Sequence, residues 1–185
     1  MVINEKALVC QVKEAYKTGG YTVAAVGEQM MLTNGAWLAI IDRDNLPGEV
    51  LGLLALHIRD IPAPGDAYRV TKTKSGAFVQ KMVLTEAISG WARMQELVQT
   101  SGTGNLMKRT SLTISGMLLY QECGGDALYM IDPRYAVMFK VHQNPVKLGN
   151  GIYSLGETSV LWVLRNVDRA LEDPLDHLKQ FRWVE

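Results

Sequence analysis

Two stretches of this sequence match one another, and this internal repeat restricts the possible folds more than any other feature of the chain. Residues 27–37 align with residues 125–135 at a constant offset of 98 positions (125 minus 27). The aligned pairs share their chemistry: Gly27 with Gly125, Glu28 with Asp126, Asn34 with Asp132, and Trp37 with Tyr135. Because matched turns fall together with matched apolar positions, the pattern predicts a duplicated helix-plus-hairpin unit. The alternative to a duplication is that part of this match reflects the apolar pattern common to strand–turn–strand segments in general.

The spacing of apolar residues predicts an α+β fold in which mostly antiparallel strands pack against helices. Helices are expected at residues 5–18, 47–58, 86–99 and 171–181. Strands are expected at residues 21–26, 30–33, 36–41, 68–73, 78–84, 111–122, 127–131, 135–141, 152–155 and 159–164. A chain of 185 residues is long enough for one domain, which we divide into two related units, residues 1–84 and 85–185.

Local signals support several of these elements. Asn34 and Gly35 form a strong hairpin signal, and Pro47 suits the first turn of a helix. That helix is apolar nearly all round, which predicts that it is buried or lies at an interface. Near the end of the chain, an apolar stripe at helical spacing is expected to pack on the body of its own chain or to bind a partner. The stripe consists of Leu171, Leu175, Leu178 and Phe181, with Trp183 close behind.

Composition restricts the compartment and the kinds of partner. Basic and acidic residues balance at 19 each, so the sequence disfavours a protein that coats nucleic acid or anionic membrane. Cys10 and Cys123 are too few and too far apart for a disulfide framework, and they favour a reducing compartment. The start of the sequence does not resemble a signal peptide, and the longest apolar run, residues 50–56, is too short to cross a bilayer. We therefore expect a cytoplasmic protein with no membrane association.

The sequence contains no recognisable catalytic or cofactor-binding motif. His57, His142 and His177 have no neighbouring histidine or cysteine at metal-ligand spacing, so no metal site is predicted. The glycine-rich residues 101–105 lack the lysine and hydroxyl residue of a phosphate-binding loop and resemble a linker instead. No GxSxG sequence marks a nucleophile. The prediction is a protein without enzymatic activity and without a cofactor.

The second copy of the repeat resembles a known family. An apolar strand at residues 116–120 leads through glycines into a second strand, an aspartate and an Arg-Tyr pair at residues 124–135. This arrangement is similar to the strand–turn–strand signature of DNA sliding clamps. Residues 46–51, Leu-Pro-Gly-Glu-Val-Leu, look like the proline-led helix of a clamp domain. The resemblance implies a clamp-like domain that associates with copies of itself to close a ring, with DNA as a partner.

If the resemblance holds, basic residues on the helices and after the linker would face DNA phosphates. The candidates are Lys6, Lys13, Lys17, Arg93, Lys108 and Arg109. Binding through protein contacts or self-association is the broader expectation, with DNA association as its specific form.

Two other classes of function stay open. One is a small-ligand binder or enzyme with a pocket between the two units, lined by polar and aromatic residues near the matched turns: Trp37, Asp42, Asp132 and Tyr135. The other is a structural or regulatory component of a phage or mobile element.

Overall fold

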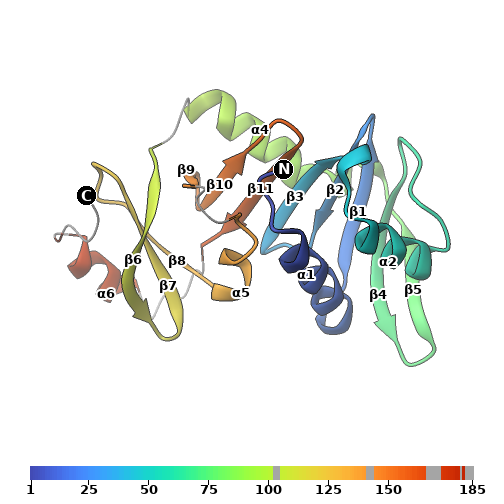
Figure 1. Cartoon of the computed structure of the whole chain (residues 1–185), viewed down its shortest axis with the longest axis horizontal. Helices are drawn as coiled ribbons and strands as arrows, with labels where there is room; N and C mark the ends of the chain where they lie inside the picture. The colour runs from blue at the N-terminus through green and yellow to red at the C-terminus, as the bar shows by residue number, and fades with distance from the viewer. Residues whose placement is uncertain (102–104, 141–143, 166–171, 180, 182–185) are drawn as a thin grey trace.

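The computed structural model describes residues 1–101, 105–140, 144–165, 172–179 and 181, and it confirms the predicted α+β class. The described strands form one eight-stranded and one three-stranded sheet, both antiparallel, with helices packed against them (Figure 1). The larger sheet has the order β5-β4-β1-β2-β3-β11-β10-β9 and the smaller sheet the order β6-β7-β8. None of the described helices combines the length and the apolar character that crossing a bilayer requires.

The large sheet contains the following strands: β1 (Tyr21–Val26), β2 (Gln29–Thr33), β3 (Trp37–Asp42), β4 (Ala67–Thr73), β5 (Gly76–Lys81), β9 (Val146–Leu148), β10 (Gly151–Leu155) and β11 (Ser159–Leu164). The small sheet contains β6 (Met107–Ile114), β7 (Met117–Glu122) and β8 (Leu128–Ile131). The helices are α1 (Glu5–Thr18), the short 3-10 helix η1 (Arg43–Asn45), α2 (Gly48–Ile58), α3 (Leu84–Ala87), α4 (Ser89–Ser101), α5 (Pro133–Ala136) and α6 (Glu172–Leu178).

Helices cover both faces of the large sheet, and the central strands therefore bury both of their faces. On one face Val23 and Leu32 pack against α1 and α2, as part of the largest apolar cluster. On the other face Ala24 and Met31 pack beneath α3 and α4, which contribute Ala87 and Trp91. Since successive side chains of a strand alternate between faces, nearly continuous apolar strands such as β1 and β3 need two covering layers.

The first helix begins and ends as the sequence predicts. Asn4 caps α1 by accepting a hydrogen bond at its side-chain oxygen from the backbone N–H of Ala7. After the helix, Gly20 adopts a φ of +88° and lies directly against the backbone of β4. A side chain at this position would overlap the carbonyl oxygen of Val70, so the close approach of α1 to the sheet requires glycine here.

Three predicted elements differ from the structure. The strand expected at residues 135–141 is wrong: the short helix α5 begins at Pro133, because Asp132 accepts a hydrogen bond from the backbone N–H of Arg134 and proline suits the first helical position. The strand expected at residues 111–122 is two strands, β6 and β7, which meet at a turn with positive φ at Ser115 and Gly116. The helix expected at residues 86–99 is divided into α3 and α4 at Ile88.

The predicted hairpin of the repeat, with a strand on each side of the aligned turn, is present only in the first copy, where β2 pairs with β3. Strands β1 and β2 pair across a turn at Gly27 and Glu28, and β7 and β8 pair in the same antiparallel sense across residues 123–127. In the first copy the chain continues into β3, whereas in the second copy it enters α5. The large sheet also takes strands from both predicted units, because β11 pairs with β3.

The small sheet is attached to the large one along one face and one edge. On one face of the small sheet, Leu118 and Ile131 belong to the apolar cluster that also contains the buried side chains of α1. On its other face, Leu119 and Met130 pack with Leu175 of α6. An isolated bridge between Leu106 and Val146 joins the start of β6 to β9. Within the predicted C-terminal stripe, Leu175 is buried and packs on its own chain, Leu178 packs beside it and Phe181 is 50% exposed. Leu171, Trp183, most of the predicted linker and His142 lie outside the described residues.

Candidate functional site

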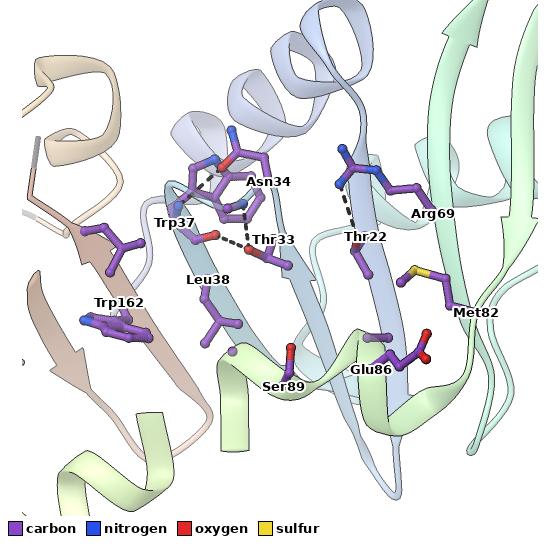
Figure 2. A pocket seen from close by; sticks show the side chains of 14 residues that line it. Thr22, Thr33, Asn34, Trp37, Leu38, Arg69, Met82, Glu86, Ser89 and Trp162 are labelled. Atoms are coloured by element: carbon purple, nitrogen blue, oxygen red, sulfur yellow. Dashed lines mark hydrogen bonds between the residues drawn. The ribbon is translucent and has the colours of Figure 1, made fainter. Parts of the chain in front are cut away.

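A cavity lies at one end of the large sheet, beneath the break between α3 and α4 (Figure 2). We call it the Arg69 pocket; its volume is about 300 Å³. Its walls are contributed by the four strands β1 to β4, by β11 and by the α3–α4 region. The lining residues include Thr22, Thr33, Leu38, Arg69, Met82, Glu86, Ala87, Ser89, Trp162 and Leu164.

Strand alternation explains why apolar and polar side chains meet in this pocket. Leu38 and Trp162 are paired across β3 and β11 and point to the α3–α4 face of the sheet, where both are buried. Thr22 and Arg69 are paired across β1 and β4 and share that face. The pocket therefore has an apolar wall formed by Leu38 and Trp162, and a cationic wall formed by Arg69 (Figure 2).

The guanidinium of Arg69 is held by hydrogen bonds at the rim of the pocket. Its Nη2 donates to the backbone oxygen of Gly19 at 2.7 Å, and its Nη1 donates to the Thr22 hydroxyl at 3.3 Å. Within the described part of the chain, no carboxylate forms an ion pair with Arg69. Its positive charge is therefore positioned by neutral groups and is available to a ligand.

The turn that closes the end of the pocket is fixed by its own side chains. The Thr33 hydroxyl donates to the backbone oxygen of Trp37 at 2.6 Å and accepts from the N–H of Gly35 at 3.1 Å. Asn34 accepts at Oδ1 from the N–H groups of Ala36 and Trp37. Such side-chain bonds stabilise a tight turn with positive φ, here +94° at Gly35. Thr33 and Asn34 therefore shape the pocket wall.

A second cavity, of about 400 Å³, lies beside the same turn. We call it the Arg134 pocket; it is lined by Gly35, Ala36, Asp132, Arg134, Tyr135, Leu164 and Arg165. Asp132 and Arg134 form a bidentate ion pair, with a shortest N–O distance of 2.7 Å. Hydrogen bonding to the Arg134 guanidinium lowers the pKa of the Asp132 carboxyl. The charge of Asp132 is therefore already neutralised by Arg134.

The four predicted pocket residues are divided between three places. Asp132 and Tyr135 line the Arg134 pocket together with Gly35 and Ala36 of the first unit. Trp37 lines the Arg69 pocket and is only 1% exposed. Asp42 lies at the other end of β3, where it accepts a hydrogen bond from the Gln29 side chain at 3.0 Å, and it lines neither cavity.

The six basic residues predicted to face DNA are not gathered on one surface. Lys6, Lys13 and Lys17 are exposed on α1, and Lys13 forms an ion pair with Glu49 at 3.5 Å. Arg93 is exposed on α4, which covers the opposite face of the large sheet. Lys108 and Arg109 lie on β6 of the small sheet.

The described residues contain no cluster of three or more potential metal ligands. His57 is buried between α2 and the sheet, where its Nδ1 lies 3.0 Å from the hydroxyl of Tyr21 and its ring stacks on Tyr16. Burial lowers the pKa of this histidine. Its partners are aromatic side chains of the core, so it serves packing at this position.

Arg69 and Trp162 line the Arg69 pocket, yet the sequence carries no motif that singles them out. Both occupy ordinary strand positions, and their approach depends on the order of strands in the sheet. No protein-family model matches the sequence. A search of curated proteins also finds no significant match.

Proposed function

We propose that this chain is a non-enzymatic binding protein, and that the Arg69 pocket holds a small molecule with an apolar body and a carboxylate. One observation supports the proposal above all others. The Arg69 guanidinium forms no ion pair with any described residue. It lines a cavity whose opposite wall is formed by Leu38 and Trp162.

The proposal follows from how such pockets bind ligands. Small-molecule sites are mostly apolar cavities of about 300–1,000 Å³ with a few fixed polar groups that orient the ligand. An arginine presents a planar fork of donors that matches a carboxylate, and a guanidinium held by hydrogen bonds loses little freedom when it binds one. Glu86, on the α3 side of the pocket, would repel a second anionic group and so favours a single carboxylate.

Calorimetry with two matched probes tests this function. Phenylpropionate should bind, and its uncharged amide should bind at least about tenfold more weakly, because a charged hydrogen bond contributes roughly 1.5–3 kcal/mol. The Arg69→Gln variant should remove the preference for the acid. Arg93→Gln, an exposed arginine on the outer side of α4, is the matched control and should change neither affinity.

A second variant separates loss of the pocket from loss of the charge. Ser89 is an exposed lining residue, so Ser89→Trp should fill the cavity from its rim without disturbing the core. It should weaken both probes. Equal affinity for acid and amide, or unchanged binding by Arg69→Gln and Ser89→Trp, would contradict the proposed site.

A further inference from the structure

Strand β5 is an open edge of the large sheet. It pairs with β4 on one side and ends the strand order on the other, far from the small sheet (Figure 1). The opposite edge is different, because β9 is continued by the bridge between Leu106 and Val146 and by the hydrogen bond from Lys147 to Asn105. The sheet therefore has one edge that is joined to the rest of the chain and one that is open.

The register of β4 and β5 shows which backbone groups face outward. Met82 donates to the carbonyl oxygen of Ala67, which makes these two residues a hydrogen-bonded pair. Since such pairs alternate along an antiparallel ladder, the N–H and C=O groups of Ala77, Val79 and Lys81 point away from β4. Nothing in the described part of the chain forms a backbone hydrogen bond with these outward groups.

Strand β5 lacks the bulges and prolines that often protect an edge strand. Its pairing with β4 runs in unbroken register from Tyr68 opposite Lys81 to Thr73 opposite Gly76. All of its residues except Val79 are exposed, and the ring of Phe78 is 56% exposed. A regular, accessible edge of six residues is a template for an added strand.

The charged side chains of the hairpin formed by β4 and β5 are all basic. Residues 67–85 contain Arg69, Lys72, Lys74 and Lys81 and no aspartate or glutamate. Lys81 forms an ion pair with Asp66 at 2.9 Å, whereas Lys72 and Lys74 form no ion pair with any described residue. Two copies paired edge to edge would bring the same lysines together and repel one another. The charge favours an acidic partner.

We propose that β5 is a docking edge that accepts an acid-rich, extended segment of another polypeptide as a ninth strand. The outward groups of Ala77, Val79 and Lys81 supply its backbone hydrogen bonds. Lys72, Ala77 and Lys81 share the α1–α2 face of the sheet, so acidic side chains of the added strand belong on that face. Phe78 lies on the other face, where the alternate side chains of the partner are apolar.

This inference is independent of the Arg69 pocket and concerns a different surface. Nucleic acid is the other polyanion that a basic hairpin attracts. Its phosphates would contact the lysines, but they would leave the outward backbone N–H and C=O groups of β5 without hydrogen-bond partners. Backbone pairing therefore distinguishes a polypeptide from nucleic acid at this edge.

The test uses a fluorescein-labelled peptide of about seven residues that alternates glutamate with valine, matching the length and period of a strand. A peptide that alternates lysine with valine is its control, and an oligothymidylate of about 20 nucleotides is the nucleic-acid probe, since single strands bind basic surfaces. Anisotropy with the full chain should show saturable binding of the acidic peptide, at least about tenfold tighter than the lysine peptide.

Two variants of the chain make the test specific. Val79→Pro removes an outward N–H and no bond to β4, so it should keep the fold and weaken the acidic peptide by about tenfold or more. Lys72→Glu with Lys74→Glu should weaken it by about three- to tenfold, through two exposed charge pairs. Lys6→Glu with Lys17→Glu changes the net charge equally on α1 and should have no effect. Thermal unfolding checks that each variant is folded.

Four results would overturn the proposal. The first is that the acidic peptide does not bind, and the second is that Val79→Pro binds it unchanged while remaining folded. The third is that the oligothymidylate binds more tightly and tolerates Val79→Pro, which would assign the hairpin to nucleic acid. The fourth is that light scattering shows a dimer that Val79→Pro dissociates, which would assign the edge to a second copy.

Discussion

The buried pair of Tyr21 and His57 provides a quantitative test of how α2 is attached to the sheet. Tyr21 lies on β1 with no exposed surface, and His57 lies on α2 with 8% exposed. The Tyr21 hydroxyl and the His57 Nδ1 are 3.0 Å apart. Their hydrogen bond joins two elements that are separated by 36 residues in the sequence.

The substitution Tyr21→Phe removes the hydroxyl and keeps the shape of the ring. The remaining cost is the loss of one hydrogen bond and a histidine nitrogen buried without a partner, which together amount to about 1–3 kcal/mol. For a chain of this size, each kcal/mol lowers the melting temperature by about 2–4 °C. A cavity contributes little, because the only heavy atom removed is one oxygen.

Urea unfolding followed by circular dichroism measures this change, and the slope of the free energy against urea should stay constant. Tyr16→Phe is the matched control, because Tyr16 is half-buried, stacks on the same histidine at 3.9 Å and keeps that contact as phenylalanine. A loss below about 0.5 kcal/mol in Tyr21→Phe, or an equal loss in Tyr16→Phe, would refute the reasoning, since surface changes cost that little.

Three further outcomes are expected from other parts of the molecule. Burial lowers the pKa of His57 from its usual 6.5, so the folded chain binds the proton less readily than the unfolded chain. The free energy of unfolding should therefore fall as the pH drops through 6.5 and become constant below the pKa of the folded state. Urea unfolding at a series of pH values measures this dependence, and His57→Leu should remove it. Gly20→Ala should cost more than the roughly 1–2 kcal/mol of a left-handed residue, because its Cβ would overlap Val70, whereas Gly27→Ala, with open space around it, should cost only that amount in urea unfolding. The clamp resemblance predicts a closed oligomer by light scattering and DNA retention at low salt, and unchanged retention after charge reversal would end the DNA hypothesis. The positions for reversal are Lys6, Lys13, Lys17, Arg93, Lys108 and Arg109.

The sequence predicted those parts of the fold that depend on neighbouring residues. The helix after Asn4 and the one after Pro47 were predicted from local capping and periodicity, and the hairpin of β2 and β3 was predicted from Asn34 and Gly35. The third strand of the second copy was predicted wrongly, because the alignment of Trp37 with Tyr135 outweighed the helix-starting signal of Asp132 and Pro133. A repeat in the sequence therefore does not decide whether a strand or a helix follows the aligned turn, because local capping decides it.

The candidate site was less accessible to sequence analysis, for a topological reason. Asp132 and Tyr135 do line one cavity with the turn of the first unit. Arg69 and Trp162, by contrast, meet because β4 and β11 face the same side of one sheet. Strand order is a property of long-range pairing, and periodicity carries no information about it.

The pairing of β3 with β11 also has a consequence for how the chain emerges from the ribosome. Ile41 of β3 pairs with Ser159 of β11, which is synthesised 118 residues later (159 minus 41). One edge of β3 therefore has no partner strand until β11 has been synthesised. At about 5–20 residues per second, the apolar edge of β3 stays unpaired for roughly 6–24 seconds. During that interval the nascent chain presents the row from Trp37 to Ile41 to any other strand it meets. Conditions that slow translation between β3 and β11 should therefore promote aggregation of this protein more than conditions that slow translation before β3.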